Sequence, residues 1–192
     1  MKTEKQNPLK SISKLMWLFT LVVLFACNNP KGFTQECNSR VKPKIDIHTA
    51  VITENVEALK QHIEAGTNLN EKDPFGGSSP LISAALFGKT EMAKTLIEAG
   101  ADINFQNNEG STALHTASFF CRPAIVAMLL KKGSDKAIKN KFGSTAHESV
   151  AGSFAEVKQI YEMMGKMLES MGLKLDYAYI EKTRPDIAKM LK

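Results

Sequence analysis

The sequence contains few of the residues that build metal centres or nucleophilic active sites. Its 192 residues include four histidines and three cysteines, and these are scattered along the chain. A zinc site needs three or four converging ligands, and a nucleophilic cysteine needs a base and an orienting partner. Neither arrangement is recognisable in the sequence, and a glycine-rich phosphate-binding loop is also missing. We therefore predict that the protein is not an enzyme and that it binds no metal or cofactor.

A cluster of positive charge is also missing from the sequence. The formal net charge is +5, but residues 1–26 contain four lysines against a single glutamate. The rest of the chain is therefore close to neutral. Proteins that bind DNA or RNA by displacing counterions need lysines and arginines gathered on one face. We therefore expect no nucleic-acid partner.

No hydrophobic run in the sequence is long enough to cross a bilayer comfortably. The longest uncharged apolar run is LMWLFTLVVLFA at residues 15–26, whereas a transmembrane helix needs about 20 apolar residues. The 14 residues before this run are polar and basic. A basic segment followed by a short apolar segment is typical of an export signal. The sequence therefore predicts a signal peptide over residues 1–26.

Residues 24–27, with the sequence LFAC, resemble the lipobox of bacterial lipoproteins. The resemblance implies that Cys27 carries lipid on its sulfur and that the chain is cleaved just before it. Two or three acyl chains would anchor the protein, because each buried methylene contributes ~0.8 kcal/mol. The alternative is an uncleaved signal anchor in which Cys27 has no special role. Residues 27–44 are mostly polar, with two prolines and one glycine, and predict a flexible tether.

The remaining chain repeats itself with a period of about 33 residues. Gly77, Gly110 and Gly143 are separated by 33 residues each. The segments after these glycines align as SSPLISAA, STALHTAS and STAHESVA. Further segments align as HIEAGTNLN, LIEAGADIN and LLKKGSDKA. A fixed period of this length is typical of a solenoid whose units stack to bury their apolar faces.

This pattern resembles the ankyrin repeat, which reads G-x-T-P-L-H-x-A-A and later L-L-x-x-G-A-D-V-N. The resemblance covers residues 45–164 as about three to four units. It implies an all-α fold, namely an ankyrin-repeat solenoid of helix pairs joined by short β-hairpin loops. Residues 165–192 match no repeat but contain enough apolar side chains to pack, and we predict a C-terminal helical tail. Pro185 followed by DIAKMLK indicates a short final helix in that tail.

Individual residues fit the roles that this pattern requires. The hydroxyls of Ser79 and Thr112 can cap the first helix of their units, and Pro80 suits the first turn, where a missing N–H costs little. We expect three glycines to end the second helices in the left-handed conformation. These are Gly66, Gly100 and Gly133.

The first and last units depart from the pattern. Asp46 stands where the pattern has proline, and we predict that the first unit is an N-terminal cap. His147 and Glu148 stand where the pattern has leucine and histidine. We therefore predict that the last unit is a polar C-terminal cap.

The histidines and the cysteines beyond Cys27 have structural explanations. His48 and His115 fall at the repeat's histidine position, where the resemblance implies hydrogen bonds that tie helix to hairpin. His62 belongs to a second helix, and we expect it to be exposed. Cys37 and Cys121 could pair in an oxidising compartment. The alternative is two unpaired thiols.

The resemblance also indicates where a partner would bind, because ankyrin arrays usually bind with their hairpin tips and the exposed ends of their first helices. The candidate contact residues at the tips are Phe75, Asn108, Glu109 and Phe142. Those on the helices are Leu86, Phe87, Phe119 and Phe120. Aromatic side chains of this kind are favoured anchors of interfaces. The alternative is that the C-terminal tail covers the apolar helix residues or that they point into the core.

From these observations we expect a protein-binding module tethered to the bacterial cell envelope by a lipid. Its role would be that of an inhibitor or immunity protein, or of an accessory subunit, for an envelope enzyme. The alternative is a structural scaffold that organises an envelope assembly. A scaffold predicts a fixed stoichiometric complex without effect on an isolated enzyme, whereas an enzyme predicts a polar pocket with a perturbed acid or base.

Overall fold

The computed structural model describes residues 43–192. The predicted signal peptide, the lipidation site Cys27, most of the tether and Cys37 lie outside the described residues. The described part of the chain is helical and contains no β-strand. None of its helices is long and apolar enough to cross a membrane.

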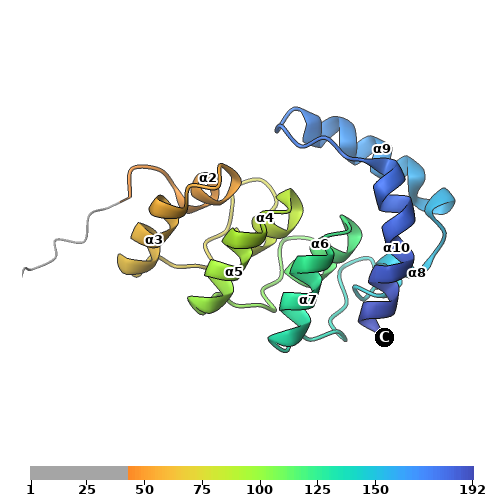
Figure 1. Cartoon of the computed structure of the whole chain (residues 1–192), viewed down its shortest axis with the longest axis horizontal. Coiled ribbons are helices and arrows are strands. Elements are labelled where there is room, and N and C mark those ends of the chain that lie inside the picture. The colour runs from red at the N-terminus through yellow and green to blue at the C-terminus, as the bar shows by residue number, and fades with distance from the viewer. Residues whose placement is uncertain (1–42) are drawn as a thin grey trace, which may run out of the picture. The chain divides into compact units, whose positions relative to one another are not determined.

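The helices form a series of antiparallel pairs (Figure 1). The pairs are α2 (Ile47–Ile52) with α3 (Val56–Glu64), α4 (Pro80–Phe87) with α5 (Thr90–Glu98), and α6 (Ala113–Phe119) with α7 (Pro123–Lys131). The first helices α2, α4 and α6 contact one another in sequence, and α5 contacts α7. Two layers of helices result, which is how a solenoid buries a continuous core.

The predicted helix starts are present. The Ser79 hydroxyl accepts a hydrogen bond from the Ile82 amide at 3.4 Å, and Pro80 opens α4. Thr112 caps α6 through a reciprocal arrangement, because the Thr112 amide donates to His115 Nδ1 while the His115 amide donates to the Thr112 hydroxyl. Both caps satisfy backbone N–H groups that a helix leaves without internal partners.

The second helices end as the repeat register predicts. Gly100, after α5, has φ +89°, and Gly66 and Gly133 have φ +69° and +82° after the helices α3 and α7. A side chain is disfavoured in this left-handed region, whereas glycine adopts it freely.

Small and branched apolar residues fill the space between the two layers. Ala84, Ala85 and Ala117 are fully buried on the first helices, so that these helices can approach closely. Leu96 and Leu129 are fully buried on the second helices. No pair buries this surface alone, so each unit depends on its neighbours for stability.

The loops between the units are simpler than the predicted β-hairpins. In the loop before α6, the Asn107 amide donates to the Ser111 carbonyl at 3.0 Å, and in the next loop Asn140 donates to Ser144 in the same way. One such bond closes each loop, and one further bond, from the Gly110 amide to the Asn107 carbonyl or from the Gly143 amide to the Asn140 carbonyl, tightens its turn. This is too few to form a strand ladder, so the loops are tight turns and the hairpin prediction is wrong in that respect.

The C-terminal third departs most from the repeat. The first helix of the fourth unit is the single turn α8 (Glu148–Ala151), followed by the longer α9 (Phe154–Glu169) and α10 (Tyr177–Leu191). Helix α9 runs through residue 164, where the sequence places the end of the repeats. Helix α10 is longer than the predicted short final helix, because its start is capped by Asp176 and Pro185 lies inside it.

Helix α10 packs across the end of the array. It contacts α6, α7, α8 and α9 (Figure 1). Its buried residues are Ile180, Arg184, Ile187 and Leu191. The tail is therefore a folded part of the core, as its apolar content predicts, and it closes the array together with α8.

Candidate partner-binding surface

Two phenylalanines stand out from the loops between the units. Phe75 is 93% exposed and Phe142 is 76% exposed, although each is large and apolar. The exposed residues Asn108 and Glu109 occupy the loop between them. The four tip residues predicted from the sequence therefore all lie on one row of loops.

Hydrogen bonds join neighbouring loops in this row. The Asn108 amide donates to the Gly76 carbonyl at 3.0 Å, and the Lys141 amide donates to the Glu109 carbonyl at 2.9 Å. Each loop is thus fixed to the one before it. A row of preformed loops loses little conformational freedom when it binds a partner.

A single side chain fixes the shape of each loop. In the first loop, Asp73 accepts hydrogen bonds from the amides of Phe75, Gly76 and Ser78 at 2.6–2.8 Å. Burial alone would raise the pKa of the Asp73 carboxyl, but these backbone donors outweigh it and lower that pKa. Asn107 and Asn140 take the same position in the later loops and accept two backbone bonds each. The exposed phenylalanines are therefore held on rigid turns.

The apolar residues predicted on the first helices lie in different surroundings. Leu86 and Phe87 are partly exposed at the end of α4. Phe119 is also partly exposed, whereas Phe120 is 4% exposed and belongs to the core. The rings of Phe119 and Phe120 meet edge to face with centroids 5.2 Å apart. Three of these four residues can therefore reach a partner, and the ring of Phe120 cannot.

Helix α9 covers one side of this group. The Tyr161 ring on α9 stacks on Phe119 with centroids 4.4 Å apart, and its hydroxyl donates to the Phe119 carbonyl. Arg184 on α10 donates to the Tyr161 hydroxyl at 2.9 Å. The cover over part of Phe119 therefore comes from Tyr161, which precedes the predicted tail of residues 165–192, and the tail contributes only Arg184, which holds the Tyr161 hydroxyl.

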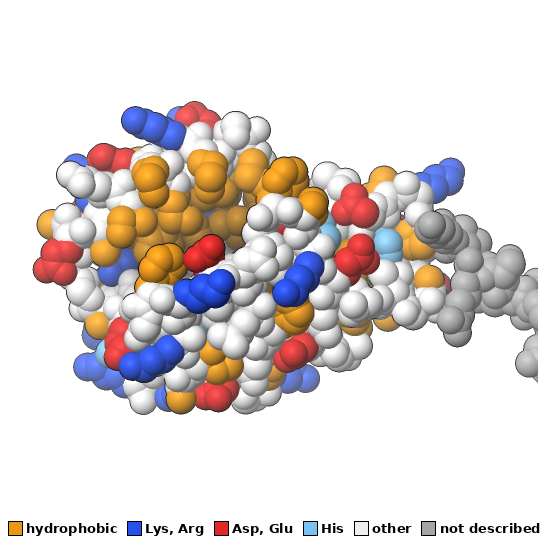
Figure 2. All heavy atoms as spheres, turned by 180° about the vertical axis from the view of Figure 1, so that it is seen from behind, with side chains coloured by type: hydrophobic (Ala, Val, Ile, Leu, Met, Phe, Trp, Pro, Cys, Tyr) orange, Lys and Arg blue, Asp and Glu red, His pale blue; other side chains and the backbone are white. Residues whose placement is uncertain are grey.

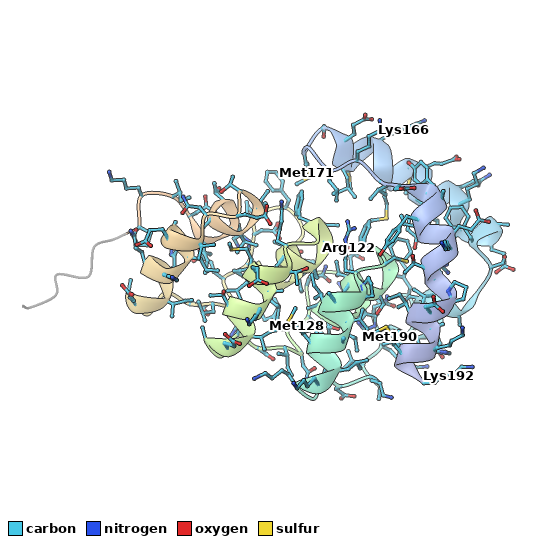
Figure 3. All side chains as sticks on the ribbon, in the orientation of Figure 1. Arg122, Met128, Lys166, Met171, Met190 and Lys192 are labelled. Carbon is cyan, nitrogen blue, oxygen red and sulfur yellow. The ribbon has the colours of Figure 1, made fainter. Side chains whose placement is uncertain are left out.

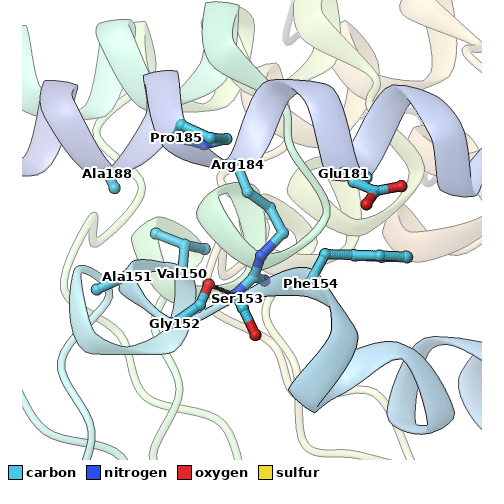
Figure 4. Close-up of a pocket in the computed structure, with 9 residues that line it drawn as sticks. All are labelled: Val150, Ala151, Gly152, Ser153, Phe154, Glu181, Arg184, Pro185 and Ala188. Carbon is cyan, nitrogen blue, oxygen red and sulfur yellow. Dashed lines mark hydrogen bonds between the residues drawn. The ribbon is translucent and has the colours of Figure 1, made fainter.

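Arg184 is itself an unexpected feature, because it is 2% exposed and has no carboxylate partner among residues 43–192. Its guanidinium also donates to the carbonyls of Ser149 and Gly152 at 3.4 and 3.3 Å. It borders a small cavity between α10 and the turn from α8 to α9, about 200 Å³ in volume (Figure 4). Neutral acceptors thus surround the charge, and the guanidinium joins α8, α9 and α10.

The histidines hold the array together. His115 Nδ1 accepts from the Thr112 amide, so Nε2 carries the proton and donates to the Ser144 carbonyl of the next loop at 3.1 Å. His48 makes the corresponding contact with the Glu71 carbonyl at 3.0 Å. The expected exposure of His62 is wrong. It is buried because its ring bonds to the Ile45 carbonyl and the Thr67 hydroxyl.

Cys121 is a buried, unpaired thiol in the structure. It has φ +52° at the turn after α6, where the preceding unit has Gly88 at φ +69°. Its sulfur lies 3.6 Å from the Ile180 carbonyl of α10. Burial raises the pKa of the thiol to about 11, although Arg184 and Arg122 act in the opposite direction. A protonated thiol under a helix is unreactive.

Sequence reasoning missed Tyr161, Arg184 and the exposed apolar side of α9. The period carries no information on them, because they lie where the repeat register is lost. The spacing of apolar residues along α9 was the one signal that could have pointed to that helix. Among residues 43–192, no group of histidine, cysteine, aspartate or glutamate side chains could hold a metal ion.

Residues 47–140 match the family model described as ankyrin repeats in three copies. The ankyrin-repeat domain of Bcl-3, a member of the IkappaB family, superposes with a TM-score of 0.52 at 34% sequence identity. The match covers 54% of this chain and 45% of that one.

Three curated proteins are similar over shorter stretches. The DNA-binding protein RFXANK of Homo sapiens is 35% identical over 69 residues, and the E3 ubiquitin-protein ligase KEG of Arabidopsis thaliana is 34% identical over 67 residues. The 2-5A-dependent ribonuclease of Homo sapiens is 30% identical over 88 residues. These stretches are 36%, 35% and 44% of this chain. They span 26%, 4% and 12% of the relatives, so each similarity concerns only a part of the relative's chain. Residues 47–140 are therefore ankyrin repeats, and the pairs α2–α3, α4–α5 and α6–α7 form an ankyrin-repeat domain.

Proposed function

We propose that this protein is a protein-binding module of the bacterial cell envelope, held at the membrane by a lipid on Cys27. Ankyrin repeats imply protein–protein interaction as the general function. The observation that carries the proposal is the row of loops in which Phe75 and Phe142 are almost fully exposed. Large apolar groups on rigid turns are favourable anchors for a partner, because they bury area at little entropic cost.

The partner-binding surface in this proposal consists of the loop row and the partly exposed helix residues beside it. Its members are Phe75, Leu86, Phe87, Asn108, Glu109, Phe119 and Phe142. Phe120 is left out because its ring is in the core. We propose that the partner is an envelope enzyme, which the module inhibits or supports as an accessory subunit.

The binding proposal is tested with the double variant Phe75→Ser and Phe142→Ser. The tagged full chain is used to capture partners from solubilised envelopes, and the recovered proteins are identified by mass spectrometry. We expect a protein recovered with the wild type to be lost with the double variant while the melting temperature stays the same. Val56→Ser is the matched control, because Val56 is an exposed apolar residue on α3 away from the loop row. Equal recovery with both variants would contradict the proposed surface.

The membrane proposal has its own test. Labelling with an alkyne analogue of palmitate should be positive for the wild type and negative for Cys27→Ala. An unlabelled wild-type chain would instead support the uncleaved signal anchor.

The alternative role as a scaffold is distinguished by adding the purified chain to the captured enzyme. A change in the enzyme's rate supports an inhibitor or accessory subunit, and an unchanged rate in a fixed complex supports a scaffold.

A further inference from the structure

Helix α9 is apolar over far more of its circumference than it buries. Tyr161, Gly165 and Leu168 face the rest of the fold and are buried. Next to them is a stripe of exposed apolar residues at helical spacing, which we call the α9 stripe. It consists of Ile160, Met163 and Met167 on α9 and Met171 in the turn just after it. Met163, Met167 and Met171 are 68%, 59% and 51% exposed. A helix normally turns polar residues towards solvent, so a stripe of this kind marks a contact surface.

The α9 stripe borders a hollow in the molecular surface. Figure 2 shows hydrophobic side chains gathered around this hollow. On the repeat side, the partly exposed residues are Leu86, Phe87 and Phe119 at the ends of α4 and α6. Figure 3 shows Met171 and Arg122 in the region between α9 and the ends of α4 and α6. The hollow therefore has apolar walls on both sides.

Arg122 gives this apolar hollow a charge that nothing in the described part of the chain neutralises. It is partly buried, and its Nη2 donates to the Leu86 carbonyl at 3.3 Å. Its Nε is buried and has no hydrogen-bond partner among residues 43–192. None of the ion pairs there involves Arg122.

The preceding unit shows which partner Arg122 lacks. Lys89 is the N-cap residue of α5, and Arg122 is the N-cap residue of α7 in the next unit. Lys89 pairs with Glu54 of the unit before it at 3.1 Å. The residue equivalent to Glu54 one unit later is Gly88, and its backbone lies against the Arg122 guanidinium. The cation is thus repeated but the carboxylate is not. A partly desolvated cation without a carboxylate favours a partner that supplies one.

We propose that the hollow binds an amphipathic helix of a partner protein, whose apolar residues pack on the α9 stripe and whose edge carries a carboxylate that pairs with Arg122. This inference rests on the proposed protein-binding function and adds a recognition element separate from the loop row. Methionine-rich walls suit a helix in a groove, because the flexible side chains adapt to different apolar anchors. A lipid surface fits less well, since α9 has no excess of basic residues and the surface is hollowed rather than flat.

The test uses synthetic peptides of the same length as α9, cross-linked to hold them helical. Each peptide has leucines spaced by three and four residues on one face. One carries glutamates at the edge of that face, and the other carries lysines at the same positions. The purified full chain is labelled with ¹³C at its methionine methyl groups. Peptide binding is followed by NMR and by fluorescence anisotropy.

With the acidic peptide, we expect the methyl signals of Met163, Met167 and Met171 to shift in a saturable way. Met128, on α7, is the internal control and should not shift. The basic peptide should bind at least about tenfold more weakly, a ratio that corresponds to about 1.4 kcal/mol. Arg122→Gln should remove this discrimination. Lys89→Gln should leave it unchanged, because Lys89 already has Glu54 as its internal partner.

Three outcomes would overturn the inference. The first is the absence of methionine shifts with either peptide, and the second is equal affinity for both peptides. The third is a shift of these methionines that depends on protein concentration or on phosphatidylcholine vesicles rather than on peptide, which would assign the stripe to a second copy or to a membrane. The Phe75→Ser and Phe142→Ser variant should still bind the acidic peptide. This result distinguishes a failure of the proposed peptide site in the hollow from a failure of the proposed binding surface on the loop row.

Discussion

Arg184 Nη1 donates a hydrogen bond to the Tyr161 hydroxyl at 2.9 Å, and the two side chains join the last two helices of the chain. The hydroxyl in turn donates to the Phe119 carbonyl at the end of α6. Helix α6 and the two last helices, which are distant from it in sequence, thus meet at one phenolic oxygen. This point links the tail, which has no repeat pattern, to the ankyrin-repeat domain.

Removal of that oxygen should destabilise the whole domain. In Tyr161→Phe, the Arg184 donor and the Phe119 carbonyl both lose a partner in a buried site. We expect a loss of about 1–3 kcal/mol in the free energy of unfolding, measured by urea denaturation. Tyr179→Phe is the control, because Tyr179 lies exposed on α10. An equal effect of the two substitutions would show that the buried contacts of the hydroxyl contribute nothing.

Acidification should destabilise the domain through His115. Burial lowers the pKa of His115 below its ordinary value of 6.5, although hydrogen bonds to Ser144 and Ile138 act in the opposite direction. The unfolded chain therefore takes up a proton at a pH where the folded chain does not, and stability falls as the pH drops below 6.5. Denaturation curves between pH 7.5 and about 5 should show a smaller decline for His115→Gln than for the wild type. Parallel declines would contradict this assignment.

Alkaline conditions should destabilise the domain through Cys121. Its pKa is raised from 9.0 to about 11, chiefly by burial. The stabilising contribution of the protonated thiol is complete below pH 9 and is lost as the pH rises towards about 11. The variant Cys121→Gly removes this titration and also suits the positive φ. Its stability should fall less steeply than that of the wild type across this range. Identical slopes would mean that the thiol titrates alike in both states.

Gly100→Ala should measure the cost of the left-handed helix end alone. Gly100 has φ +89°, and an added Cβ would meet no atom within 4 Å. Any loss of stability must therefore come from the backbone conformation, and we expect about 1–2 kcal/mol by thermal or urea unfolding. Gly76→Ala is the matched control. Gly76 lacks a positive φ and its Cβ would make only an ordinary contact. If Gly100→Ala were as stable as the wild type, the repeat register assigned to Gly100 would be wrong.

The sequence predicted those parts of the fold that depend on local chemistry. Gly66, Gly100 and Gly133 are left-handed, Ser79 and Thr112 are caps, and His115 ties α6 to the next loop, because each role is decided by a few neighbouring residues. A role of this kind repeats wherever the local pattern repeats. The assignment of residues to equivalent positions in successive units therefore followed from the repeat period alone.

Tertiary contacts decided the parts that the sequence did not predict. His62 is buried because its ring bonds to the carbonyl of Ile45, 17 residues earlier in the chain. Phe119 and Phe120 have adjacent positions and the same chemistry, yet one ring is partly exposed and the other is in the core. The course of α9 and α10 depends on Tyr161 and Arg184, whose partners lie in other helices. No spacing within one unit could have revealed such contacts.

The packing of α10 constrains how this array can grow by duplication. Helix α10 contacts α6, α7 and α8, and so it occupies the surface on which a further unit would stack. A copied unit placed after α7 would separate Tyr161 from Phe119 and open the buried site of Arg184. A copy inserted between α5 and α6 would leave all these contacts in place. Variation in the number of repeats is therefore tolerated in the middle of the array and opposed at its C-terminal end.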